Sequence, residues 1–342
     1  MRRALWAALV FIAACALRDI APLAPPAPGA SIYPIDIITT RVPRPGTASL
    51  FGADRDTVLN YARADVSVPP THRTGQIAYP NGPADAARTF AVTGLTPYRT
   101  FAQMEAALGA APEVVLYIHG FNNTVPEAAF QLAQIRHDFE IDQPTVLFAW
   151  PSAADVRGYL YDRDSVLFAR GDLVETLRNL TARRRVLIVA HSMGSLLTME
   201  AMRQLALAGE GRVLRRISGV TLVSPDIDSE LFRRQAADIG TLPEPFVIFV
   251  AQSDRALTLS GLLTGRRERL GTITRAEDIG DLPVAVVDFT ALAARRGLNH
   301  QIALESPAAI RILRSVREGE ATAFERLAPY LINPPARLSA RE

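Results

Sequence analysis

The 342-residue sequence contains no lysine, and all 37 of its basic residues are arginine. No Schiff-base, pyridoxal-phosphate or phosphate-loop lysine is therefore available, which excludes several classes of enzyme. A single cysteine rules out an internal disulfide bond and a cysteine-based zinc site. Only five histidines are present, and no two stand four apart in a helical pattern. The sequence therefore predicts no metal site and no cofactor.

The overall composition is that of a folded protein without a strong charge. Apolar residues make up 49% of the chain and charged residues 21%, which is typical of a packed core, and the length suits one large domain or two smaller ones. The formal charge is +2, and removal of residues 1–14 leaves 35 basic and 35 acidic residues. Because no basic field remains, we expect no nucleic-acid partner.

The N-terminus has the organisation of an export signal. Met1-Arg2-Arg3 precedes an apolar run over residues 4–14, which is too short to span a bilayer as a stable helix. Residues 1–14 predict a signal peptide, and Cys15 follows the expected cleavage point, as in the lipobox of bacterial lipoproteins, whose cysteine is lipidated. An ordinary signal peptide and an uncleaved anchor are the alternatives. We expect an exported, periplasm-facing protein of the bacterial cell envelope, held at the membrane by a lipid anchor on Cys15.

Composition divides the rest of the chain into four parts. Residues 15–31, rich in proline and alanine, predict a semi-rigid tether after the lipidated cysteine. Residues 32–98 hold short strand-like pieces broken by proline and glycine, and predict N-terminal strands that join a larger sheet. Residues 99–325 predict the main α/β core, and residues 326–342 a C-terminal tail.

Within the core, short apolar runs rich in valine and isoleucine alternate with longer amphipathic stretches. Such runs are typical of strands buried on both faces, so the alternation predicts a mostly parallel sheet with helices on both faces. The expected strands are 114–118, 145–149, 186–190, 220–223, 246–251 and 284–287, and the expected helices are 126–139, 165–180, 193–207, 231–239 and 301–317. Active sites in such folds lie beyond the C-terminal ends of the strands.

One expected strand runs directly into a serine motif. His191-Ser192-Met193-Gly194 follows residues 186–190, and a helix begins there, which matches the Gly-x-Ser-x-Gly elbow with Ala190 in first position. The pattern predicts Ser192 as a nucleophile on a strained turn, with the Met193 amide facing a developing anion. The alternative is a serine that caps an ordinary Rossmann-like helix.

A second motif supports the catalytic interpretation. The expected strand 114–118 ends in His119-Gly120-Phe121-Asn122, and alpha/beta hydrolases place an oxyanion donor on a His-Gly turn after the third strand. We assign the amide of Phe121 to this role, with Asn122 as the alternative donor. We expect His119 to hold the loop rather than to act in catalysis.

The candidate base and acid follow the serine in the chain. His300 is the only histidine C-terminal to Ser192, which makes it the candidate base. His191 adjoins the nucleophile, but adjacent side chains of an elbow diverge, so we do not expect it to reach. Asp254 follows the next-to-last expected strand and is the candidate acid, and Asp226, after the strand before, is the alternative acid.

These segments together resemble a known group of proteins. Uncharacterised bacterial alpha/beta hydrolases of the esterase/lipase superfamily are similar to this chain at residues 117–123, 148–152, 190–194, 224–228 and 253–257. The N-terminal residues 38–41 and 67–69, with His72, are also similar to that group. The resemblance implies the alpha/beta hydrolase fold, the triad Ser192, Asp254 and His300, and cleavage of carboxylic esters. It names no natural substrate.

The sequence thus predicts a serine hydrolase that cleaves small-molecule or lipid acyl esters through an acyl-enzyme. An acyltransferase would use the same triad with an alcohol in place of water, and a catalytically silent envelope lipoprotein would use the fold for binding. Residues 257–263 suggest either a mobile apolar flap over the site or a segment that packs on the sheet.

Overall fold

The computed structural model describes residues 23–44, 50–265, 268–293, 299–318 and 322–333. Cys15 and the expected signal peptide, residues 1–14, lie outside the described residues. The strands are β1 (Ser31–Pro43), β2 (Phe51–Val68), β3 (Ala91–Tyr98), β4 (Glu113–Ile118), β5 (Thr145–Ala149), β6 (Arg185–His191), β7 (Ile217–Val223), β8 (Phe246–Val250), β9 (Ala285–Asp288) and β10 (Leu331–Asn333). The α-helices are α2 (Phe101–Leu108), α3 (Val125–Asp138), α4 (Tyr159–Thr181), α5 (Met193–Leu207), α6 (Gly211–Leu214), α7 (Ser229–Ile239), α8 (Arg255–Leu263), α9 (Ile302–Glu305), α10 (Pro307–Arg317) and α11 (Ala323–Leu327).

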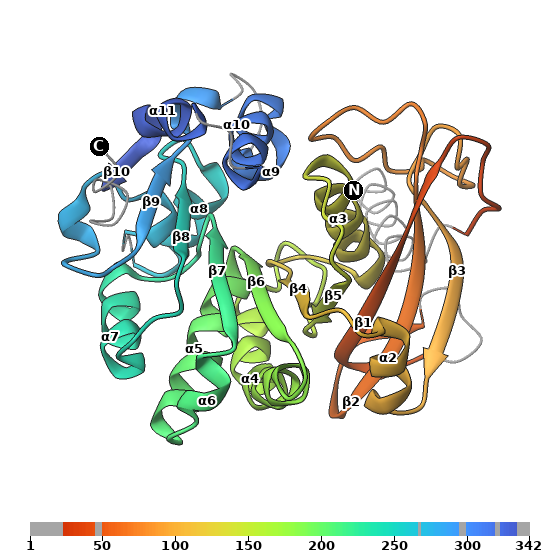
Figure 1. Ribbon diagram of the computed structural model, residues 1–342, viewed down its shortest axis with the longest axis horizontal. Coiled ribbons are helices and arrows are strands. Elements are labelled where there is room, and N and C mark those ends of the chain that lie inside the picture. Colours follow the sequence, from red (N-terminus) through yellow and green to blue (C-terminus); the bar gives the residue numbers. More distant parts are fainter. Residues whose placement is uncertain (1–22, 45–49, 266–267, 294–298, 319–321, 334–342) are drawn as a thin grey trace, which may run out of the picture.

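All ten strands form one sheet in the order β10-β9-β8-β7-β6-β4-β5-β1-β2-β3 (Figure 1). The strands from β9 through β1 in this order pair in parallel, whereas β2, β3 and β10 pair antiparallel with their neighbours. The expected α/β fold with a mostly parallel sheet is therefore confirmed. Its parallel strands end on a common edge, where the candidate site residues follow β4, β6, β7 and β8.

The N-terminal strands are longer than the sequence pattern indicated. β1 pairs antiparallel with β2 over most of its length and parallel with β5, with Ile35 opposite Thr145. β1 therefore extends the hydrolase sheet by one parallel strand, and β2 and β3 complete its far end. At the other end, β10 adds an antiparallel edge strand beside β9 from a segment that showed no strand pattern.

One helix expectation was wrong in its extent. The stretch expected as a single helix over 301–317 forms two helices, α9 and α10, which meet at Ser306-Pro307. Proline lacks the backbone N–H that a continuous helix requires at this position, but it is favoured at the first position of a new helix. The hydroxyl of Ser306 caps α10 by accepting a hydrogen bond from the Ala309 amide.

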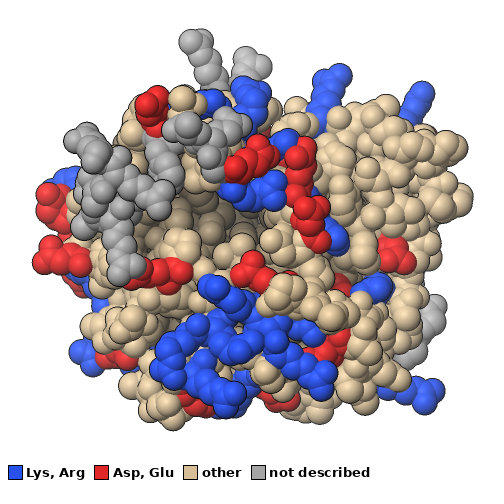
Figure 2. All heavy atoms as spheres, in the orientation of Figure 1, with Lys and Arg blue, Asp and Glu red and all other residues tan. Residues whose placement is uncertain are grey.

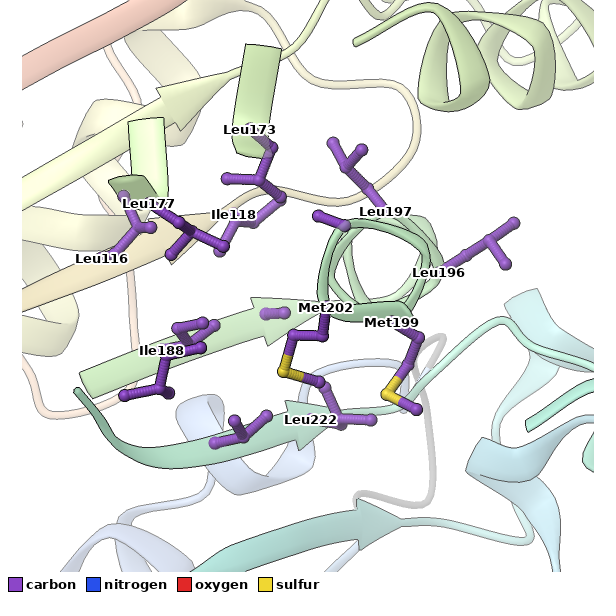
Figure 3. Close-up of a cluster of buried hydrophobic side chains, with 14 of the residues drawn as sticks. Leu116, Ile118, Leu173, Leu177, Ile188, Leu196, Leu197, Met199, Met202 and Leu222 are labelled. Atoms are coloured by element: carbon purple, nitrogen blue, oxygen red, sulfur yellow. The ribbon is translucent and has the colours of Figure 1, made fainter. Parts of the chain in front are cut away.

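Helices cover both faces of the sheet. Figure 3 shows leucine and methionine side chains of α4 and α5 packed against β4, β6 and β7, all within one buried cluster. The opposite faces of the same strands belong to a second cluster that includes side chains of α3, α9 and α10. Burial of these apolar side chains is the main source of stability and fixes the strand ends on which the site stands. In the described part of the chain, no helix is both long and apolar enough to cross a membrane.

Candidate active site

Ser192 stands on a strained turn between β6 and α5. Its backbone has φ 52° and ψ −120°, a left-handed conformation that is unusual for a residue other than glycine. The Ser192 amide donates to the carbonyl of Val223 on β7, and its carbonyl accepts from the amides of Ser195 and Asp226. These bonds hold the turn in place and leave the serine side chain directed at the pocket described below.

Two glycines allow the neighbouring loop to approach this turn. A Cβ atom at Gly194 would lie 2.4 Å from the carbonyl oxygen of His119, and a Cβ atom at Gly120 would lie 2.6 Å from the ring of His191 and 3.0 Å from the Ser192 Cβ. Only glycine fits at either position without displacing the elbow or the loop. The sequence motif around Ser192 therefore has a structural cause in close backbone contact.

The loop after β4 presents a backbone amide beside the elbow. Asn123 donates from its side chain to the carbonyl of Phe121 at 3.0 Å, and the amide of Asn122 donates to Asp162. Within the described residues, no group accepts a hydrogen bond from the amides of Phe121 or Met193. Because the Asn122 amide has an acceptor, the geometry favours Phe121 and Met193 as the pair of amides that could receive an oxyanion.

Two buried charged side chains, Asp162 and Arg41, hold the loop after β4 in place. Asp162 accepts hydrogen bonds from the Asn122 amide and from the hydroxyl of Ser152, and burial raises the pKa of its carboxyl group. The guanidinium of Arg41, from β1, donates to the carbonyls of Trp150 and Asn123 at 3.1 and 2.9 Å. The added N-terminal strand thus reaches the loop that carries the amide of Phe121.

His119 has a supporting position in the same loop. Its ring stacks on Trp150 with centroids 4.8 Å apart, and its two ring nitrogens lie 2.8 and 3.1 Å from the carbonyl oxygens of Gly120 and Trp150. Burial lowers the pKa of His119 to about 3, so the ring is neutral at physiological pH. This arrangement holds the loop and leaves the ring no access to the pocket.

The structure brings His300 and Asp254 together. Nδ1 of His300 lies 2.7 Å from Oδ2 of Asp254, whose side chain is fully buried. The other carboxylate oxygen of Asp254 accepts from the Leu257 amide and caps the start of α8, where the helix dipole favours a negative charge. Ser192 and His300 line one pocket, and no hydrogen bond joins their side chains among the described residues.

His191 occupies a place that the sequence did not indicate. Its ring centroid lies 4.7 Å from that of His300, and both rings line the pocket. Burial, together with the nearby His300, holds the pKa of His191 well below its usual range. The sequence around the elbow did not predict the contact between the rings of His191 and His300. This contact depends on how the distant segment around residue 300 folds back onto the elbow.

Asp226 has different partners from those of a triad acid. Its carboxylate accepts hydrogen bonds from Tyr159 and Ser260, both at 2.9 Å, and lies 3.2 Å from Nε of the buried Arg269. Burial raises the pKa of Tyr159, which keeps its phenol protonated as a donor. His300 is therefore paired with Asp254. Asp226 instead connects α4, α8 and the segment around Arg269.

Phe121, Ser192, Asp226 and His300 line one pocket of about 630 Å³. Its lining comes from the loop after β4, from α3, from the segment before α4, from the elbow, from α8 and from the residues around α9. In Figure 2 the face shown is hollowed below the position that α9 has in Figure 1. The pocket lies at the C-terminal ends of the strands and is large enough for a small ester.

A separate group of residues combines side chains of the kinds that bind metals. His72, His137 and Asp138 have ligand atoms within 4.8 Å of one another. Nε2 of His72 lies 2.7 Å from the carboxylate of Asp138, which also accepts from the Gly75 amide, and Nδ1 of His137 lies 2.9 Å from the Tyr33 hydroxyl. His72 thus bonds to Asp138 and His137 to Tyr33, so the group forms a polar junction between the N-terminal segment and α3.

The fold, with a strand-turn-helix elbow at Ser192, is that of an alpha/beta hydrolase. The chain belongs to the family described as alpha/beta hydrolase of unknown function (DUF900), whose model matches residues 102–317. No curated protein matches the sequence.

Solved structures with a similar course of the chain include several esterases. One of two fungal esterases from Rhizomucor miehei is 12% identical, with 84% of each chain covered and a TM-score of 0.40. Carboxyl esterase 2 from Tuber melanosporum is 11% identical, with 91% of this chain and 97% of that chain covered and a TM-score of 0.39. Esterase B from Lactobacillus Rhamnosis is 13% identical, with 95% and 94% covered and a TM-score of 0.37.

Proposed function

We propose that this protein is a serine hydrolase that cleaves carboxylic esters through an acyl-enzyme. The observation that carries the proposal is the 2.7 Å hydrogen bond between His300 and the buried Asp254, in the pocket that Ser192 enters from a left-handed elbow. A histidine oriented by a carboxylate, in the same pocket as a serine on a strained turn, is the arrangement that activates a hydroxyl nucleophile.

The proposed reaction uses three side chains and two backbone amides of this chain. Nε2 of His300 accepts the proton of Ser192 Oγ as the oxygen attacks the acyl carbonyl, and Asp254 holds Nδ1–H and stabilises the imidazolium. The amides of Phe121 and Met193 receive the oxyanion. His300 then protonates the leaving alcohol, and a water molecule, deprotonated by His300, releases the carboxylic acid and restores Ser192. Catalytic hydrogen bonds are often longer before substrate binds, so the open contact between Ser192 and His300 is compatible with this role.

Hydrolysis of p-nitrophenyl butyrate by the purified full chain tests the proposal. Ser192→Ala should lower kcat by about 10⁶ and leave the circular dichroism spectrum unchanged. Ser218→Ala is the matched control, because the Ser218 hydroxyl bonds to no described group and lies on β7. Turnover in Ser192→Ala at the wild-type rate would exclude the triad. Product analysis with added alcohol separates hydrolysis from acyl transfer, since an acyltransferase would yield a new ester.

We also propose that the enzyme is exported and anchored at the envelope through a lipid on Cys15. The support is the sequence alone: a basic start, a short apolar run and one cysteine placed directly after it. Metabolic labelling of the producing cells with an alkynyl fatty acid tests this. Label should be incorporated into the wild-type chain and be absent from Cys15→Ser, whereas equal labelling of both would contradict the anchor.

A further inference from the structure

The pocket around Ser192 has two unlike walls. One wall comes from α8 and the segment before α4, where Val156, Leu257 and Leu259 line the pocket. The other wall comes from α3 and the residues around α9, where Gln131 and Glu305 line it. Figure 1 shows α3 and α8 on opposite sides, with α9 between them. The first wall is called the apolar wall below, and the second the polar wall.

The chemistry of the reaction decides which wall faces the alcohol. The leaving oxygen must take its proton from His300, so the alcohol lies on the side of that ring. Nδ1 of His300 is bonded to Asp254 at the start of α8, so the donating Nε2 is on the other edge of the ring. The chain after His300 enters α9, which is joined to α3 by a hydrogen bond from Gln134 to the carbonyl of Leu304 at 3.0 Å. The alcohol part of a bound ester therefore meets the polar wall.

The acyl chain is directed the other way. Its carbonyl oxygen points at the amides of Phe121 and Met193, and the ring of Phe121 packs edge-on against Tyr159 with centroids 5.6 Å apart. Tyr159 is bonded to Asp226, which also holds Ser260 of α8. A chain that leaves the oxyanion amides on this side runs along the apolar wall.

Resting on the ester-hydrolase function proposed above, we propose that the substrate is an ester of an aliphatic acid with an uncharged, hydroxyl-bearing alcohol. The aliphatic chain contacts Val156 and Leu259 on the apolar wall. The hydroxyl groups of the alcohol meet the amides of Gln131 and Gln301 and the carboxylate of Glu305 on the polar wall, groups that accept and donate hydrogen bonds readily.

The charges around the pocket disfavour an anionic alcohol. Glu127 and Glu305 both belong to the polar wall, and the one basic residue among the described lining side chains, Arg255, belongs to α8. Burial raises the pKa of Glu305, because a negative charge is unfavourable at this position. An anionic group on the substrate would add a second negative charge beside this carboxylate and would be repelled by it. In Figure 2 the largest group of arginines on this face lies below the hollow, over α4 and α5 of Figure 1, and acidic side chains lie between it and the hollow.

Two esters that differ by one phosphate test the polar wall. Glycerol monobutyrate and its 3-phosphate share the acyl chain and the glycerol, so the ratio of their kcat/KM values cancels any effect on Ser192 or His300. Repulsion from Glu305 across the pocket predicts that the uncharged ester is preferred by about tenfold or more. Glu305→Gln should reduce this ratio about threefold or more, and Glu277→Gln, at an exposed position distant in sequence, should leave it unchanged. A ratio near one, or a ratio that Glu305→Gln does not change, overturns the assignment.

A series of p-nitrophenyl esters from acetate to octanoate tests the apolar wall. Leu259→Ser should lower kcat/KM for octanoate about fivefold or more and leave acetate unchanged, because only the longer chain reaches that side chain. Leu207→Ser, at another exposed leucine at the far end of α5, is the control. If Leu259→Ser changed the phosphate ratio and left chain-length dependence intact, the two walls would be reversed. If wild type hydrolysed none of these esters, the proposed function itself would fail, whereas hydrolysis without discrimination overturns this inference alone.

Discussion

Replacement of Asp226 by asparagine should lower folding stability rather than remove the catalytic acid. The carboxylate is 5% exposed and lies 3.2 Å from the guanidinium of Arg269, which is 3% exposed. Asparagine has nearly the same shape and can still bond to the hydroxyls of Tyr159 and Ser260. It has no charge, so the variant leaves Arg269 as a buried cation without its counter-ion.

The expected magnitude follows from this unpaired charge. Removing one partner of a buried ion pair costs roughly 3–5 kcal/mol, and retention of the two hydroxyl contacts puts Asp226→Asn near 3 kcal/mol. At about 2–4 °C per kcal/mol, Tm should fall by roughly 6–12 °C. Urea unfolding, followed by fluorescence of the buried Trp150, measures the free energy directly. The double variant Asp226→Asn/Arg269→Met should recover part of the loss, because it buries no unpaired charge.

The kcat of Asp226→Asn tests whether Asp226 has a structural role or is the catalytic acid. His300 keeps its bond to Asp254 when Asp226 is changed, so kcat for p-nitrophenyl butyrate, measured below the unfolding transition, should fall by no more than about tenfold. A loss of about 10⁴ in kcat with unchanged stability would refute the reasoning. It would make Asp226 the group that supports the base.

Three further changes have defined outcomes. Asp254→Asn should lower kcat by about 10⁴, because an amide cannot stabilise the imidazolium; activity near wild type would contradict this assignment. Gly120→Ala should lose about 1–3 kcal/mol in urea unfolding and most of its activity, because the added methyl group meets His191 and Ser192, and full activity would disprove the close contact. The neutral His119 has a pKa of about 3 when folded and a higher one when unfolded. Below about pH 6.5 the unfolded chain therefore binds a proton that the folded chain does not. The free energy of unfolding decreases as the pH is lowered from about 6.5. The slope between pH 6 and 4 should be about 1.4 kcal/mol per unit shallower in His119→Asn, and equal slopes would count against a buried neutral ring.

Local patterns were enough to predict the fold and the candidate triad. The elbow around Ser192 and the loop at Phe121 depend on short segments whose spacing is set by one strand and the turn after it, so their sequence carries the signal. His300 followed from being the one histidine after the serine. The preference for Asp254 over Asp226 came from position in the strand order, and the structure adds the hydrogen bond to His300.

The parts that the sequence did not indicate depend on contacts between distant segments. The pairing of Asp226 with Arg269 joins residues 43 positions apart. Arg41 of β1 donates a hydrogen bond to the carbonyl of Asn123, in the loop after β4, more than 80 residues away in the sequence. The periodic spacing of apolar residues, which indicates helices and strands, carries no information about such contacts. The break between α9 and α10 is different, because Ser306-Pro307 was a readable signal that the amphipathic pattern over 301–317 outweighed.

The central claim is that Ser192 is an activated nucleophile. The most direct measurement is to label the purified protein with a fluorophosphonate probe and to map the modified residue by mass spectrometry. The account predicts one modified residue, Ser192, and loss of labelling in His300→Ala, because the serine then has no base. Folded protein that remains unlabelled, or labelling of Ser192 that persists at the same rate without His300, would contradict it.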